Sequence, residues 1–486
     1  MPKTFFEDFQ TSLGRRDTIE ALRNGLVGEG LVIEGPLGPK KMIYADYIAS
    51  GRALMQVEWA VLNEILPYYA NSHTEGSLCG ATMTRLRREA RTYIAGQCGA
   101  DARHAVIFAG SGATTALNRI VGLLGVTDAV ARGERPLVVI GPYEHHSNIL
   151  PWRESGAEVI EIEEAANGGP DMVALESALE TGQGRLMIGA FSAASNVSGI
   201  ITDVKAVTRL LKSYGARAVW DYAGGGPYMT VDMAAGTDAE IDAVALSPQK
   251  FIGGPGASGV LIVRKAAVTH KKPTITTGGG TVRFVSPRAH DYLEDITERE
   301  EAGTPNVVGD LRAALVLAVK AAIGQRTLDE RHEELRHRAL DAWHGLPGLQ
   351  IMGNPDADRA LPFFSIRLVD EKGQDRLHPL LLTRVLSDCF GIQARGGCAC
   401  AGPYGHRLLG IDEAASEGIR RRILAGEAML KPGWTRFNLS ALMDDEMADK
   451  IIDAIRLIAL KPDRYAALYS FDAASDDFVL RQRPAA

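Results

Sequence analysis

The chain has 486 residues, and its 53 Lys and Arg against 60 Asp and Glu give a formal charge of −7. This mild acidity argues against a dedicated nucleic-acid binder, which usually carries a basic face. The apolar runs fall short of the roughly 18 residues that a membrane span needs. Five cysteines in so long a chain are too few for a disulfide framework. We therefore expect a two-domain cytoplasmic enzyme that binds neither nucleic acid nor membrane.

Short apolar runs rich in β-branched residues predict the strands of one sheet. They occupy residues 105–110, 137–143, 158–163, 186–192, 218–223, 243–247 and 259–264. Helical-looking stretches or loops separate most of them, and one such helix opens at Thr202 and Asp203 and closes at Gly215. Apolar strands that alternate with helices predict a seven-stranded, mostly parallel sheet covered on both faces. We expect a large α/β domain over residues 41–310.

The pattern changes after about residue 310. Two long helices are expected first, over 310–324 and 327–344, and then a strand over 362–368 and a helix over 379–389. A loop with two cysteines follows, and a closing helix is expected near 446–459. This order predicts a smaller α+β domain over 311–470. Residues 1–40 are expected to form an N-terminal segment and 471–486 a tail.

Three segments carry the chemistry expected of the large domain. In 108–118, glycines lie between a strand and a helix whose N-terminal N–H groups could bind phosphate, although a purely structural turn has the same pattern. Asp221 ends an apolar strand, where it could meet a ligand or cap a helix. Lys250 precedes a Gly-Gly-Pro-Gly loop, unlike a solvated surface lysine. A phosphate site, an acid and an amine in this order predict a pyridoxal phosphate (PLP) site.

With these segments the chain resembles the class V, fold-type I PLP enzymes, and within that class the group II (SUF-type) cysteine desulfurases. The further matching segments follow in family order between about residues 44 and 455. They are 144–148 with Pro151 and Trp152, 195–199, 278–280, 302–306, 395–403 and 436–440.

The resemblance implies roles for individual residues toward the cofactor. Lys250 forms the Schiff base and moves protons at Cα, Asp221 pairs with the ring nitrogen, and His145 stacks on the ring. The phosphate group is expected at Gly112, Ala113, Thr114, Ser247 and Gln249. Gly280 and Thr304 lie in regions that complete the site across the dimer interface in relatives.

The resemblance also implies roles toward the substrate. Asn196 lies beside the substrate or the ring oxygen, and Arg436 clamps the substrate carboxylate as a bidentate donor. Without the motifs, His145 would be interpreted as a capped loop histidine, Asn196 as a turn former and Arg436 as a solvated surface residue.

Cys400 aligns with the catalytic cysteine of the family when the loop is counted from Arg395. Sulfur transfer needs a thiolate, and a mobile loop would let it reach the substrate. The alternative, a buried small hydrophobe, is what we expect of Cys79, Cys98 and Cys389.

Cys398 stands where the family has a histidine. The resulting Cys-x-Cys is similar to that of molybdenum-cofactor sulfurases. A metal site with His406 is not expected, because three ligands on one short loop are not a standard zinc spacing. A disulfide with Cys400, a resolving role and no role at all stay open for Cys398.

Two further positions depart from the desulfurase pattern. Gly224 replaces a Gln that usually bonds the phenolic oxygen of the cofactor, and Gln249 replaces a His. The long stretch between Cys400 and Arg436 contains a predicted helical insertion over 413–425, which would cover the site or dock a partner.

These observations give a leading hypothesis and two alternatives. The leading hypothesis is a homodimer that converts L-cysteine to L-alanine, with a persulfide on Cys400 for transfer to an acceptor protein. The first alternative is a PLP-dependent C–S or selenocysteine lyase, an epimerase or an aminotransferase. The second is a catalytically silent scaffold that binds a sulfur acceptor.

Overall fold

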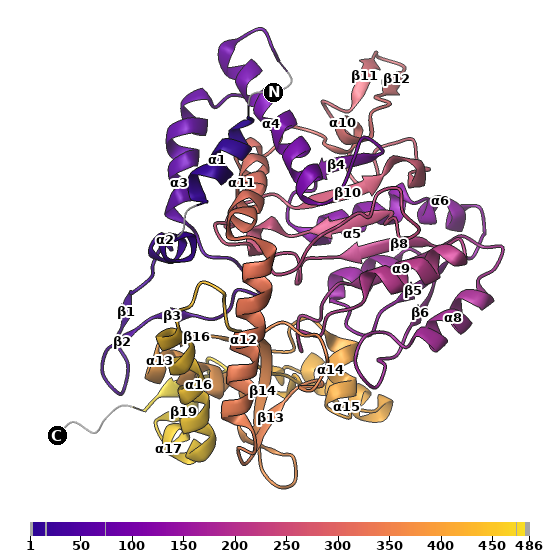
Figure 1. The fold of residues 1–486 in the computed structure, drawn as a ribbon. Coiled ribbons are helices and arrows are strands. Elements are labelled where there is room, and N and C mark those ends of the chain that lie inside the picture. Colours follow the sequence, from indigo (N-terminus) through magenta and orange to yellow (C-terminus); the bar gives the residue numbers. More distant parts are fainter. Residues whose placement is uncertain (1–2, 15–16, 73, 473, 482–486) are drawn as a thin grey trace. The chain divides into compact units, whose positions relative to one another are not determined.

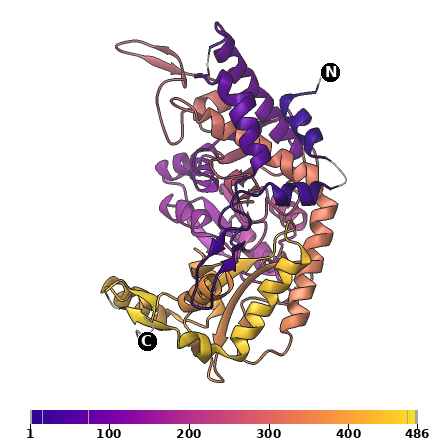
Figure 2. The ribbon, with the colours of Figure 1, turned by 90° about the vertical axis from the view of Figure 1, so that its left-hand side faces the viewer.

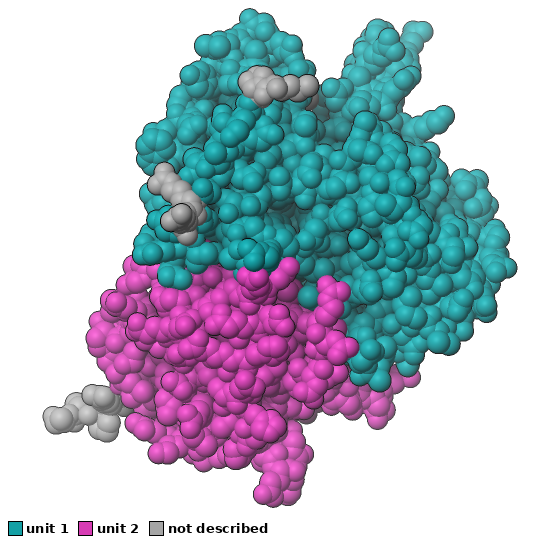
Figure 3. Space-filling model, in the orientation of Figure 1, with its two compact units in different colours: residues 1–27, 50–195, 201–328 teal, residues 28–49, 196–200, 329–486 magenta. Residues whose placement is uncertain are grey.

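The computed structural model describes residues 3–14, 17–72, 74–472 and 474–481. The chain forms two compact units, which Figure 3 shows in two colours. Unit 1 comprises Met1–Val27, Ser50–Ser195 and Ile201–Leu328, and unit 2 comprises Gly28–Ala49, Asn196–Ile200 and Asp329–Ala486. The domains expected from the sequence are continuous segments that meet at residue 310, and that division stays a prediction.

A seven-stranded sheet forms the centre of unit 1 (Figure 1). Its strand order is β4-β10-β9-β8-β7-β5-β6, in which β10 is antiparallel to both neighbours and the other pairs are parallel. The strands are β4 (His104–Phe108), β5 (Leu137–Ile140), β6 (Glu158–Glu161), β7 (Met187–Ser192), β8 (Arg217–Asp221), β9 (Ala243–Leu246) and β10 (Val260–Arg264). The expected seven-stranded, mostly parallel sheet is confirmed.

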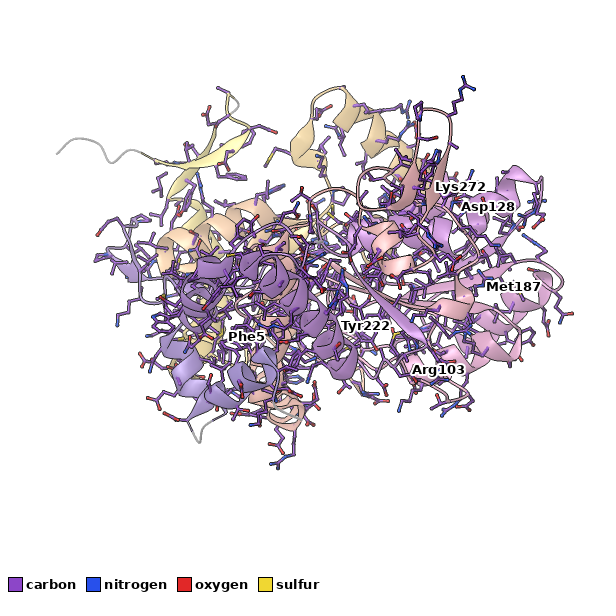
Figure 4. All side chains as sticks on the ribbon, turned by 90° about the horizontal axis from the view of Figure 1, so that it is seen from above. Phe5, Arg103, Asp128, Met187, Tyr222 and Lys272 are labelled. Atoms are coloured by element: carbon purple, nitrogen blue, oxygen red, sulfur yellow. The ribbon has the colours of Figure 1, made fainter. Side chains whose placement is uncertain are left out.

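Helices cover both faces of this sheet because its strands are apolar on both sides. On one face, alternate strand residues such as Val219 and Ala245 share a core with α5 (Ala113–Leu123) and with Trp152 of α7 (Leu150–Glu154). Side chains of a strand point alternately to the two faces, so Trp220 points the other way. Its indole Nε1 donates a hydrogen bond to Thr208 of α9 (Val204–Ser213) at 2.9 Å. Figure 4 labels Tyr222, the buried residue after β8, and Arg103, an exposed residue before β4.

The other elements of unit 1 lie around this core. A helical segment near the start packs against α11, and a two-stranded hairpin, β11–β12, projects from the unit (Figure 2). The elements are α1 (Phe5–Leu13), α2 (Thr18–Asn24), α3 (Met55–Ala60), η1 (Val61–Ile65), η2 (Leu66–Tyr68), α4 (Leu78–Gln97), α6 (Val126–Ala131), η3 (His146–Asn148), α8 (Met172–Thr181), η4 (Pro248–Lys250), η5 (Lys265–Ala267), β11 (Val282–Val285), β12 (His290–Tyr292), α10 (Ile296–Glu300) and α11 (Val307–Ile323).

Unit 2 is built on a second, antiparallel sheet of order β13-β14-β18-β17, with β15 also paired to β14. Its strands are β13 (Leu349–Ile351), β14 (Phe363–Val369), β15 (Asp375–Leu377), β17 (Arg395–Gly397) and β18 (Trp434–Asn438). The helices are α12 (Gln325–Trp343), α13 (Pro379–Phe390), α14 (Gly402–Leu408), α15 (Glu413–Leu424), η6 (Ala428–Leu430), α16 (Asp445–Leu460) and α17 (Pro462–Ala466). β3 (Ile43–Tyr44) pairs in parallel with β16 (Ile392–Gln393), which joins the segment 43–47 to this unit.

The predicted helices and the predicted strand after residue 310 match α11, α12, β14, α13 and α16 to within a few residues. The fold class, an α/β unit with a smaller α+β unit, is confirmed as well. Close to the start of the expected tail, β19 (Tyr469–Asp472) and β20 (Asp477–Leu480) form a hairpin. In the described part of the chain, none of the helices combines the length and the apolar character needed to cross a bilayer.

Candidate active site

Lys250 and Asp221 lie at the same edge of the sheet because the strands before them are parallel neighbours. β8 ends at Asp221 and β9 ends shortly before Lys250. The Asp221 side chain is buried, with 5% exposed, and accepts a hydrogen bond from the Ala223 main-chain N–H at 2.7 Å. Burial raises the pKa of Asp221, while that hydrogen bond and the positive charge of Lys250 oppose the rise. A carboxylate and an amine therefore meet at this edge.

The first turn of α5 forms a cradle with the segment after β9. Gly112 precedes the helix with φ of 74° and, as a glycine, has no side chain of its own to cap the helix start. The main-chain N–H of Ala113 donates to Oγ of Ser247 at 3.0 Å. A Cβ atom at Gly112 would lie 2.2 Å from Nε2 of Gln249, so a larger residue would displace this side chain, and the positive φ favours glycine as well. The turn thus brings together four of the residues expected at the phosphate group, with Ala113 and Ser247 in direct contact.

Thr114 extends the cradle toward His145. Its Oγ1 lies 2.8 Å from Oγ of Ser147, and that hydroxyl lies 3.0 Å from Nδ1 of His145. The Ser147 main-chain N–H also donates to Nδ1 of His145 at 3.1 Å. These contacts orient the imidazole ring from one side, which is what a ring that stacks on a ligand requires.

Gln249 has an unsatisfied atom in the same cradle. Its Oε1 is buried and finds no hydrogen-bond partner among the described residues. A buried acceptor without a partner costs about 1–3 kcal/mol, so such atoms mark places where a ligand or water completes the site. Together with the helix start, the Asp221 carboxylate and the Lys250 amine, this cradle fits a phosphorylated, carbonyl-bearing cofactor with a ring nitrogen.

Gly280 and Thr304 lie apart from the cradle residues in sequence, on two exposed loops of unit 1. The main-chain N–H of Gly303 donates to the oxygen of Gly279 at 2.9 Å, so the two loops are held together. Gly280 has φ of 85°. The structure therefore places the two loops that carry Gly280 and Thr304 next to each other, with both residues exposed.

In unit 2, Arg436 is held on β18 with only 4% of its surface exposed. Its Nη1 donates to the main-chain oxygen of Asn196 at 3.2 Å, and its Nη2 lies 3.7 Å from Oδ1 of Asp46. The interpretation of Arg436 as a solvated surface residue is therefore wrong. A buried guanidinium is a donor that a substrate carboxylate can approach without competition from bulk water.

Asn196 connects Arg436 to the cysteine loop. Its main-chain oxygen binds Arg436, and its side-chain Nδ2 donates to the main-chain oxygen of Ala399 at 2.8 Å. The side-chain oxygen Oδ1 is buried without a hydrogen-bond partner in the described part of the chain. Asn196 therefore acts on the loop and on the arginine together, and it is not a simple turn former.

Cys400 lies on a strained turn between β17 and α14. The main-chain N–H of Ala401 donates to the oxygen of Cys398 at 3.2 Å, which closes a four-residue turn. Its two central residues, Ala399 and Cys400, have φ of 54° and 55°. Of the described residues, only four that are not glycine have positive φ, and two of them are here. Each costs about 1–2 kcal/mol, and strain of this kind concentrates at functional loops.

The five cysteines differ in their exposure. Cys400 is exposed and Cys398 is half-buried, so neither is a core hydrophobe. Cys98 and Cys389 are buried as expected, and burial raises the pKa of both thiols. The expectation of a buried Cys79 is wrong, because this residue is half-buried at the exposed start of α4. Among the described residues no group of three or more His, Cys, Asp or Glu could hold a metal ion.

Glu144 is a site residue to which the sequence argument gave no role. The carboxylate is 3% exposed and accepts hydrogen bonds from the Ser192 N–H at 2.7 Å, the Ser192 hydroxyl at 2.8 Å and Nδ2 of Asn148 at 2.6 Å. Burial nonetheless raises the pKa of Glu144 to about 8, and the negative charge of Asp221 adds to the rise. Glu144 follows an apolar strand, and this is the same signal that pointed to Asp221.

Asp46 is the second residue that the sequence argument missed. It is buried between two arginines, since Nε of Arg395 lies 2.9 Å from Oδ2 and Arg436 approaches Oδ1. Arg395 and Arg436 are themselves cross-strand partners in β17 and β18. Residues 43–47 are too short a segment for a periodic pattern, so the sequence offered no signal for this role.

The structure shows where the residues that depart from the desulfurase pattern lie. Gly224 is half-buried in the turn after β8, and Gln249 belongs to the cradle. The predicted insertion is helical, as α15, and Nε2 of His406 in α14 lies 3.0 Å from Oγ of Ser416 in α15.

Comparison with known proteins gives consistent results. A "Probable cysteine desulfurase" of Halalkalibacterium halodurans is 28% identical over 381 residues, which cover 76% of this chain and 87% of that protein. A "Cysteine desulfurase" of Pectobacterium carotovorum is 28% identical over 339 residues, 69% of this chain and 78% of that protein. The solved structure of the cysteine desulfurase from Thermococcus onnurineus has a TM-score of 0.71 at 24% identity, and it covers 86% of this chain and 95% of its own.

A second solved structure, a cysteine desulfurase of Escherichia coli, has a TM-score of 0.66 at 19% identity and covers 96% of this chain and all of its own. At these identities the structures establish the shared fold. The family model described as "Aminotransferase class-V" matches residues 43–420, which include the cradle, Asp221, Lys250 and both cysteines of the strained turn. The chain belongs to the aminotransferase class V family.

Proposed function

We propose that the protein is a PLP-dependent cysteine desulfurase, which converts L-cysteine to L-alanine and takes up the sulfur as a persulfide on Cys400. The observation that carries the proposal is the double role of Asn196. Its side chain binds the cysteine turn, and its main chain binds the buried Arg436. A nucleophilic thiol and a carboxylate-binding group are thus coupled through one residue, as sulfur removal from an amino acid requires. The names of the relatives support the same activity.

The residues of unit 1 would hold the cofactor. The α5 cradle with Ser247, Gln249 and Thr114 would bind the phosphate group, Asp221 the protonated ring nitrogen, and His145 one face of the ring. Lys250 would hold the cofactor covalently and later move the proton at the substrate Cα. Bound PLP supplies an electron sink that weakens the bonds around the Cα and Cβ atoms of the amino acid.

The ionisation of Asp221 is central to this arrangement. An ionised Asp221 keeps the ring nitrogen protonated, yet burial raises the pKa of its carboxyl. Glu144, whose pKa of about 8 keeps it neutral at neutral pH, adds no negative charge beside Asp221. Neutral Glu144 therefore helps Asp221 to stay ionised.

The residues of unit 2 would handle the substrate. Arg436 binds the substrate carboxylate, and Asp46 and Asn196 fix the direction of its guanidinium. The thiolate of Cys400 attacks the substrate sulfur, the Cβ–S bond breaks, and Cβ takes up a proton. The products are L-alanine and Cys400 persulfide, so atoms and electrons balance without an outside oxidant.

A homodimer is part of the proposal. The segment that contains α3, η1 and η2 exposes a run of large apolar side chains, which a second copy of the chain would cover. They are Met55, Trp59, Leu62, Leu66, Tyr68 and Tyr69, exposed by 42–62%. The joined loops of Gly280 and Thr304 are exposed too, which fits residues that complete the site of a second copy.

The acceptor and the location complete the proposal. A protein acceptor would take the sulfur from the exposed Cys400, and α15 is the candidate docking element because it has no buried residue and joins α14 through His406. Five free cysteines support a reducing, cytoplasmic location.

The alternative of a C–S lyase is favoured by one observation. Gly224 has no side chain, so it could not supply the hydrogen bond to the phenolic oxygen of a bound cofactor that a Gln would supply. A lyase that eliminates sulfide and forms pyruvate does not need a nucleophilic cysteine.

The two activities are separated by their products. L-Cysteine and a reductant are added to PLP-loaded wild-type, Cys400→Ser and Cys79→Ser proteins, and alanine, pyruvate and sulfide are measured. The desulfurase predicts alanine and sulfide in equal amounts, lost in Cys400→Ser and kept in Cys79→Ser. Pyruvate with sulfide, or activity that survives in Cys400→Ser, would contradict it.

A further inference from the structure

The strained turn carries a second thiol, Cys398, for which the sequence left open a disulfide with Cys400, a resolving role and no role. Cys398 is the first residue of the turn and Cys400 is the third, and the Ala401 N–H bonded to the Cys398 oxygen closes it. The positive φ of both central residues corresponds to a type I′ turn, which folds the chain back sharply. The turn is fixed from outside by the hydrogen bond between Asn196 and Ala399.

This geometry keeps the two cysteines within disulfide range. Two residues of a fully extended chain span at most about 7 Å, and a turn shortens that span. A disulfide needs Cα atoms about 4.4–6.8 Å apart. The spacing of the two Cα atoms in this turn is therefore compatible with a disulfide.

The exposure of the two cysteines suits thiol–disulfide exchange. Both thiols are accessible, since Cys400 is exposed and Cys398 is half-buried. Cys98 and Cys389 are buried, and Cys79, which is half-buried, lies in α4 of unit 1, far from the turn in sequence.

We propose that Cys398 is the resolving thiol of the persulfide on Cys400, an inference that rests on the proposed function. The Cys398 thiolate attacks Sγ of Cys400, and the bond between Sγ and the outer sulfur breaks. The electron pair leaves with the outer sulfur as hydrosulfide, and a Cys398–Cys400 disulfide forms. The Cys398 sulfur is oxidised, the outer sulfur is reduced, and Sγ of Cys400 exchanges one S–S bond for another, so the step needs no external oxidant.

With this step, the fate of the persulfide sulfur depends on whether an acceptor is present. An acceptor thiol that reaches Cys400 first takes the sulfur and leaves both cysteines reduced. When no acceptor comes, Cys398 discharges the persulfide as hydrosulfide, and the disulfide blocks the next turnover. A dithiol reductant then restores the active thiols.

The test uses the PLP-loaded protein with one equivalent of L-cysteine per subunit and no reductant. Free thiols are alkylated, the protein is cleaved with trypsin after Arg395 and Arg407, and the mass of the peptide 396–407 is determined by mass spectrometry. Wild type is expected to give a peptide that has lost two hydrogens and carries no alkyl group, with sulfide equal to alanine. Cys398→Ser is expected to lose the disulfide completely and to keep one extra sulfur on Cys400. Cys79→Ser is the matched control and should behave as wild type.

Three results would count against the proposal in distinguishable ways. If wild type forms alanine but keeps the extra sulfur on Cys400 with Cys398 alkylated, the resolving role is wrong and the desulfurase stands. If the extra sulfur is found on Cys398, the attack is on the outer sulfur and the proposal is wrong. If neither wild type nor Cys398→Ser forms alanine, although both bind PLP, the proposed function fails and the resolving role with it.

Discussion

Nδ2 of Asn196 lies 2.8 Å from the main-chain oxygen of Ala399, the residue between the two cysteines of the strained turn. The same asparagine accepts a hydrogen bond from Arg436 through its main chain. A hydrogen bond of this kind contributes about 1 kcal/mol, which is comparable to the strain of one residue with positive φ. Asn196 therefore helps to hold the turn in a conformation that it would otherwise leave.

The Asn196→Ala substitution should loosen the turn. We expect sulfur uptake by Cys400 to slow about tenfold, which corresponds to about 1.4 kcal/mol of lost positioning. Amide hydrogen exchange of residues 398–401 should become faster than in wild type. Unchanged exchange at the turn would show that Asn196 does not hold it.

The Asp46→Asn substitution should disturb Arg436. Asp46 supplies the negative charge beside the buried guanidinium, so its loss leaves Arg436 and Arg395 to repel each other. We expect KM for L-cysteine to rise several-fold with a smaller change in kcat, because the carboxylate clamp is misplaced. Asp463→Asn, which breaks the exposed ion pair with Arg376, is the control and should leave both constants unchanged. A fall in kcat alone would contradict this account of Asp46.

The Glu144→Gln substitution should change the pH dependence of stability. The pKa of Glu144 is raised in the folded state from its ordinary 4.5 to about 8, so the folded protein binds this proton more tightly than the unfolded chain. The contribution is fully present below about pH 4.5 and is lost as pH rises through about 8, and each pKa unit corresponds to about 1.4 kcal/mol.

Thermal unfolding between these two pH values tests the role of Glu144. The decrease of Tm with rising pH should be shallower in Glu144→Gln than in wild type. Equal slopes would mean that Glu144 is ionised throughout. His146→Gln is a control. Burial lowers the pKa of His146, so this residue makes stability rise with pH, and its replacement should change the slope of Tm against pH in the opposite direction.

The apolar run on α3, η1 and η2 should govern the oligomeric state. Replacement of Trp59 and Leu62 by Glu puts two charges among side chains that are 59% and 62% exposed in one copy of the chain. Sedimentation should show a dimer for wild type and a monomer for the double variant. Leu424→Glu, on the exposed side of α15, is the control and should remain a dimer. If the double variant stays dimeric, α3, η1 and η2 do not form the dimer interface.

The sequence predicted the core of the fold because buried parallel strands leave a continuous apolar pattern. Val219 and Trp220 point to opposite faces of the sheet, yet both are buried, and this is why β8 was recognisable. The hairpin of β19 and β20 was missed because its strands are short and half-exposed, so no periodic pattern marks them.

The candidate site was predicted where a motif or a strand end marked it. Lys250, Asp221, Ser247 and Gly112 follow strands of the main sheet, and parallel strands bring such residues to one edge. Asp46 was missed because its role comes from pairing between β3 and β16, whose residues are far apart in sequence. The role of Asn196 was missed for a similar reason, since its partner Ala399 is 203 positions away.

The most direct test of the central claim follows the sulfur atom itself. L-Cysteine with radiolabelled sulfur is mixed with excess PLP-loaded Cys398→Ser protein, in which the persulfide is expected to persist, and the reaction is stopped after a single turnover. We predict that label bound to the peptide of Cys400 equals the alanine formed, is released by a thiol reductant, and is absent when Cys400 is also replaced by Ser. Label released as free sulfide together with pyruvate, with none on Cys400, would contradict the account.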